Sequence, residues 1–116
     1  MADMEESDEA QFAAAVRRAV LDMIGMEREF QVNERHYDWL HDVKQHTPAS
    51  LAAAAAYFML PDDLPAVIYE EVFGASGLDP SHDKRDTMTE LQRYRAAAAL
   101  QVAAIERLYI KKNWEV

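Results

Sequence analysis

The chain contains no cysteine among its 116 residues, and it has only three glycines and four prolines. The lack of cysteine excludes disulfide bonds, thiol catalysis and cysteine-ligated zinc. So few glycines leave little material for a phosphate-binding loop, and neither G-x-S-x-G nor H-E-x-x-H occurs in the sequence. Because no catalytic signature is present, we expect a protein that is not an enzyme and that uses no cofactor.

Long uncharged stretches are also lacking. The longest runs from Thr47 to Pro61, which is shorter than the roughly 20 residues needed to span a bilayer. The first nine residues hold five acids and no base, whereas a signal peptide begins with basic residues followed by an apolar run. We therefore expect a soluble, cytoplasmic chain. Frequent alanine, and more arginine than lysine, favour a bacterial or phage source.

The composition predicts an all-α fold, because the chain is rich in alanine, poor in glycine and without an alternating strand pattern. We expect a single compact domain of four to six helices over residues 7–116, after an acidic and disordered segment at residues 1–6. An apolar helix at 48–60 and a long C-terminal helix at about 88–112 are expected to form its core.

Start and stop signals divide the first half of the chain. Ser7 is the expected N-cap of a first helix that ends or loosens at Gly25, and Asn33 is the expected cap of a second helix over residues 34–45. Thr47 and Pro48 begin a third helix, since a cap residue followed by proline is a typical start. The apolar side chains expected to face inward from the first helix recur every three or four residues: Phe12, Val16, Ala19, Val20, Met23 and Ile24.

The helix at 48–60 is apolar on nearly all sides, so we expect it to be buried on all sides. The alternative is that part of it is exposed and forms a contact between copies of the chain. In that case Tyr57, Phe58 and Met59 are the expected contact residues, because aromatic residues and methionine are common at interfaces.

A fourth helix is expected after Pro61, with Asp62 or Asp63 as its cap and Gly74 as its C-terminal stop. Under this interpretation Glu70 and Glu71 lie in its last turns, where the helix dipole disfavours anions. They either pair with bases of the C-terminal helix or face a basic partner. For the fourth helix the side chains expected to face inward are Leu64, Val67, Ile68 and Val72.

The last helix is expected to follow a break near Asp86 and Thr87, because Thr87 and Glu90 form a capping-box pattern. Its apolar stripe suits either packing within the chain or a coiled coil between two chains. The stripe consists of Met88, Leu91, Arg95, Ala98, Val102, Ile105 and Tyr109. The opposite face carries small residues that would let a neighbouring helix approach closely: Ala96, Leu100, Ala103 and Ala104.

One cluster of titratable residues has the spacing of a metal site. Glu34, Asp38 and His41 recur with helical spacing and share one face, as ligands do in metal sites of helical bundles. Such a site needs matching ligands from a second helix. A solvated polar face explains the pattern more simply, so we expect no bound metal.

The net charge of −9 bears on partners. An acidic chain repels nucleic acid and anionic membranes, and it is suited to basic protein surfaces. We therefore expect a small binding module, such as an inhibitor, an immunity protein or an adaptor, that contacts a basic partner protein through Asp62, Asp63, Glu70 and Glu71. The alternatives are a self-associating assembly subunit of phage or bacterial type and, less favoured, a helical metal protein or enzyme.

Overall fold

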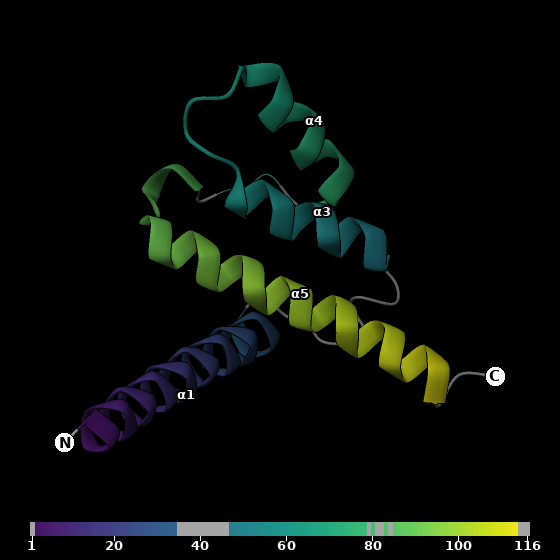
Figure 1. Cartoon of the computed structure of the whole chain (residues 1–116). Helices are drawn as coiled ribbons and strands as arrows, with labels where there is room; N and C mark the ends of the chain where they lie inside the picture. The colour runs from purple at the N-terminus through teal and green to yellow at the C-terminus, as the bar shows by residue number, and fades with distance from the viewer. Residues whose placement is uncertain (1, 35–46, 79, 81–82, 84, 114–116) are drawn as a thin grey trace.

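The fold comes from a computed structural model, which describes residues 2–34, 47–78, 80, 83 and 85–113 (Figure 1). Four α-helices follow one another in the described ranges: α1 (Ala2–Glu34), α3 (Pro48–Met59), α4 (Ala66–Ser76) and α5 (Glu90–Asn113). A short 3-10 helix, η2 (Arg85–Thr87), precedes α5. The described part of the chain contains no strand, so the predicted all-α fold with four to six helices is confirmed.

Helix α3 lies at the centre of the fold, with α5 packed on one side and α4 on the other (Figure 1). Thr47 caps its first turn as predicted, since its side chain accepts a hydrogen bond from the backbone N–H of Ser50 at 3.0 Å. The prediction of burial on all sides is wrong, because Ala52 and Ala56 are exposed. Exposing a short alanine side chain to water costs little free energy. One side of this apolar helix is therefore left uncovered at little cost in stability.

The face that α5 buries is made mostly of small residues. Ala96, Leu100 and Ala103 are buried as predicted, and Ala97 and Ala99 join them with no exposed surface. Ala97, Leu100 and Ala103 belong to the same core cluster as Leu51, Ala54, Ala55 and Phe58 of α3. The alanines among these residues let the two helices approach closely, and the larger Leu51, Phe58 and Leu100 fill the space around them.

The apolar stripe of α5 is only partly covered within the chain. Leu91, Ile105 and Tyr109 are more than half exposed. The break before α5 lies where the sequence predicts it, but the cap is Thr89 rather than Thr87. The Thr89 side chain accepts from the backbone N–H of Gln92, and the Gln92 side chain accepts from the N–H of Thr89. This reciprocal pair is a capping box shifted by two residues.

Helix α4 begins and ends later than predicted. Its N-cap is Pro65, so Asp62 and Asp63 lie in the preceding loop and do not cap it. Its C-cap is Gly77, whose φ of 67° is in the left-handed region that glycine adopts most easily, whereas Gly74 is inside the helix. Val67 faces solvent, which corrects its predicted inward position. Phe73 packs on the core instead.

Helix α1 is longer and less covered than predicted. It begins at Ala2 and not at Ser7, it continues through Gly25, and it includes Asn33, which is therefore not the cap of a following helix. Its packing is against α5, and its N-terminal half extends away from the other helices (Figure 1). The radius of gyration is 17.1 Å. A compact chain of this length would have a radius of about 13 Å, so the molecule is elongated rather than compact.

The close contact between α3 and α5 yields a stability prediction. Ala97→Leu inserts bulk where no surface is exposed, so we expect it to lower the free energy of unfolding by about 1–3 kcal/mol. Ala52→Leu makes the same chemical change on the exposed side of α3. Its free energy of unfolding should stay within about 0.5 kcal/mol of that of the parent. Urea denaturation followed by circular dichroism measures both. Equal losses in the two variants would contradict the proposed packing.

Candidate functional site

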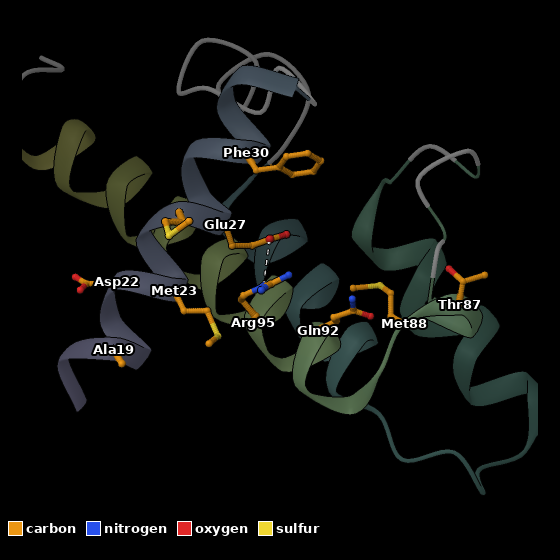
Figure 2. A pocket seen from close by; sticks show the side chains of 10 residues that line it. Ala19, Asp22, Met23, Glu27, Phe30, Thr87, Met88, Gln92 and Arg95 are labelled. Atoms are coloured by element: carbon orange, nitrogen blue, oxygen red, sulfur yellow. Dashed lines mark ion pairs between the residues drawn. The ribbon is translucent and has the colours of Figure 1, made fainter. Parts of the chain in front are cut away.

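A groove of ≈ 760 Å³ opens between α1 and the start of α5 (Figure 2). The α1 side is formed by Ala19, Asp22, Met23, Met26, Glu27 and Phe30. Thr87 of η2, the following Met88, and Gln92 and Arg95 of α5 form the other side. The walls combine methionine and phenylalanine side chains with a single ion pair, so the groove is suited to an apolar occupant with a polar edge.

Polar contacts join α1 to α5 beside the groove. Arg28 Nε donates to Glu106 Oε1 at 2.6 Å, and the Gln31 side chain donates to the carbonyl of Ala96 at 3.3 Å. Arg95 Nε lies 3.4 Å from Glu27 Oε2, and Figure 2 shows this pair joining α1 to α5 among the residues that line the groove. Buried Arg28 and Gln31 occupy the α1 face that meets α5, which leaves the neighbouring apolar face of α1 to the groove.

The apolar face of α1 continues beyond the groove along the projecting half of the helix. Phe12 is 71% exposed and Met26 is 70% exposed, while Val16 and Val20 are each close to half exposed. Between residues 7 and 20 every side chain except Ala14 is classed as exposed. Four of the six side chains predicted to face a core from α1 are therefore exposed, and an exposed apolar surface of this kind is typical of an interaction site.

The acidic residues predicted to bind a partner are not equivalent in the structure. Asp62 Oδ1 accepts from Arg85 at 3.2 Å and from Arg93 at 3.1 Å, so it is already engaged within the chain. Asp63, Glu70 and Glu71 are exposed. Among the described residues, no ion pair involves Glu70 or Glu71, and both lie in the middle of α4 rather than in its last turns. The dipole argument for their special role is therefore wrong.

The predicted contact residues of α3 separate into core and surface. Tyr57 and Phe58 are each only 6% exposed and belong to the core cluster, so they are not available to a second chain. Met59 is about half exposed. The centre of the Tyr57 ring lies 5.1 Å from that of the Phe73 ring, with the two planes tilted by 54°, and this contact joins α3 to α4. The interpretation of this helix as core is the one that fits its aromatic residues.

The metal hypothesis falls largely outside the described residues. Asp38 and His41 are among residues 35–46, and Glu34 is the last residue of α1. Within the described ranges there is no group of three or more histidine, cysteine, aspartate or glutamate residues that could hold a metal ion.

Sequence reasoning missed the most connected polar residue, Arg85. It is buried, and its guanidinium donates to the carbonyls of Tyr57, Leu60 and Pro61, at the C-terminal end of α3. It also lies 4.7 Å from the centre of the Tyr69 ring. A cation at this position complements the negative end of the helix dipole and satisfies carbonyls that the helix leaves without donors. No sequence signal indicates it, because Arg85 lies 25 residues from Leu60.

The comparisons with known proteins give no functional assignment. No family model, no curated protein and no solved structure matches this chain. Within the described ranges, no helix has the length and apolar character that a membrane-spanning segment requires.

The buried arginine can be tested by substitution. We expect Arg85→Met to reduce the free energy of unfolding by about 2–3 kcal/mol, because it leaves carbonyls at the end of α3 without donors and removes the contact with Tyr69. Asp62 is two-thirds exposed, so Asp62→Asn should cost less than about 1 kcal/mol. Chemical denaturation of both variants measures the difference. A larger loss of unfolding free energy for Asp62→Asn than for Arg85→Met would mean that the ion pairs of Asp62 supply most of the stabilisation.

The stability of the fold should also depend on Tyr57 at alkaline pH. Burial, together with the hydrogen bond to Asp83, raises the pKa of Tyr57 from 10.0 to about 12. Since the folded state holds this proton more tightly than the unfolded state, its contribution is complete below pH 10 and is lost as the pH rises towards 12. Urea midpoints measured from pH 9 to 12 should fall more steeply for the parent than for Tyr57→Phe. Parallel curves would contradict this assignment.

Proposed function

We propose that this protein is a non-catalytic protein-interaction module that binds an apolar helix in the groove between α1 and α5. The observation that carries the proposal is the position of Met23 and Met26, which line the groove instead of packing in the chain's own core. Methionine adapts its shape to different apolar surfaces and is over-represented at binding sites for amphipathic helices. An inhibitor or an adaptor would use such a groove.

The elongated shape supports the same proposal. A soluble domain loses stability when it leaves apolar side chains in water, yet Phe12, Val16 and Met26 are all exposed on one helix. A function that requires this surface would account for it. The net charge of −9 keeps such a chain soluble and repels nucleic acid, so the proposed partner is a protein.

A second candidate function is the binding of a basic protein surface by α4 and the loop before it. It is favoured by the exposure of Asp63, Glu70 and Glu71, and by the lack of any ion pair to the two glutamates within the described residues. Such a contact would be electrostatic and would weaken as salt screens it over about 8 Å at physiological ionic strength.

A crossed affinity experiment separates the two candidates. The tagged chain is incubated with lysate of its source cell at low and high salt, and bound proteins are identified by mass spectrometry. The groove proposal predicts that capture survives high salt and falls at least tenfold in Met26→Glu. The acidic-surface candidate predicts loss at high salt and in the double variant Glu70→Gln, Glu71→Gln.

The matched control is Leu21→Glu, which places the same charge on an exposed apolar residue that does not line the groove. Capture that is retained by Met26→Glu, or lost equally in Leu21→Glu, would overturn the groove proposal.

A further inference from the structure

We infer that the helix bound in the groove is α1 of a second copy of this chain, paired antiparallel to α1 of the first. This inference rests on the proposed function, because it names the occupant of the same groove. Three observations carry it: the spacing of the apolar residues on α1, the self-complementary register that this spacing allows, and the distribution of charge along the helix.

Six apolar residues form the α1 seam, and their spacing alternates strictly between four and three residues: Phe12, Val16, Ala19, Met23, Met26 and Phe30. This is the heptad pattern, with an average period of 3.5 residues, by which two helices pack along a shared line. The polar contacts that join α1 to α5 come from residues outside the seam. Among the α1 side chains that the structure describes, Arg28 and Gln31 are the buried ones, and both contact α5.

The seam matches itself when the second helix runs in the opposite direction. In the register centred on position 21, Val16 lies opposite Met26 of the second copy and Ala19 lies opposite Met23. Phe12 and Phe30 form the outermost layer. Each layer pairs a large side chain with a smaller or a flexible one, except at the phenylalanine ends, so one register fills every position of the seam.

The same register places the projecting half of α1 in the groove of the second copy. Met26 lines the groove, while Val16 belongs to the N-terminal half of α1, the half that extends away from the other helices in Figure 1. Each copy therefore supplies an exposed helix and receives one, as an isologous two-fold interface requires. The groove is incomplete without the second copy, and the projecting half of α1 is uncovered without it.

Charge selects the antiparallel direction. Residues 1–9 carry five acids and no base. A parallel pair would place both acidic segments side by side, whereas the antiparallel register separates them by about 48 Å along the helix axis, at 1.5 Å per residue. That distance is several times the screening length of about 8 Å, so the repulsion disappears.

Sedimentation velocity on the full chain tests the assembly. We expect the parent to sediment as a dimer of the 13.2 kDa chain. Met26→Glu and Phe12→Ser should each raise the dimer dissociation constant at least tenfold, and Leu21→Glu should leave it within twofold. Phe12 is 71% exposed, so its variant keeps the fold of the single chain. Circular dichroism checks that both variants remain helical.

Cross-linking tests the direction of pairing. The chain has no native cysteine, so only the introduced cysteines can form a disulfide. Val16→Cys mixed with Met26→Cys should form a mixed disulfide under mild oxidation. Neither variant alone should cross-link, because identical positions lie about 15 Å apart along the axis in this register. Cross-linking of each variant with itself would establish parallel pairing and overturn the inference.

A parent chain that stays monomeric at its highest soluble concentration overturns the second-copy inference. So does a dimer that neither Met26→Glu nor Phe12→Ser weakens. The proposed function fails separately: a monomeric parent that captures another protein, and loses it in Met26→Glu, keeps the groove as a binding site with a different occupant.

Discussion

The close approach of α3 and α5 is the contact on which the rest of the structure depends. Alanine side chains on both helices, including Ala54 and Ala97 with no exposed surface, allow the two backbones to pack with little between them. Helix α4 packs on the other side of α3, and α1 packs on α5. The positions of both outer helices therefore depend on the contact between α3 and α5. Arg85 completes it by satisfying the carbonyls at the end of α3, where the chain must turn.

The two outer helices are held by different kinds of contact. Helix α4 packs through aromatic residues, with Phe73 against Tyr57, and so extends the apolar core. Helix α1 meets α5 through side chains that are long and polar, as in the contact of Arg28 with Glu106. Polar contacts of this kind fix direction more than they bury surface, and Phe12, Val16 and Met26 of α1 remain exposed.

Much of the fold follows from the sequence where a signal is local. Thr47 with Pro48 begins a helix, and the small face of α5 is buried, as their residue types predict. The errors arise where signals compete: Gly77 rather than Gly74 ends α4, and Thr89 rather than Thr87 caps α5. The site was harder to predict, because periodicity identifies an apolar face but not the surface that covers it. Arg85 acts through contacts distant in sequence, which no local pattern reveals.

The attachment of α1 near one end has a mechanical consequence. The anchoring contacts of α1 lie at residues 27–31, so the helix from Ala2 to Arg28 is a rigid lever about 39 Å long at 1.5 Å per residue. A tilt of about 10° at the anchor would therefore move the N-terminus by about 7 Å. Small changes in the length or angle of the Arg28–Glu106 contact are thus amplified into a large displacement of the acidic end of the chain.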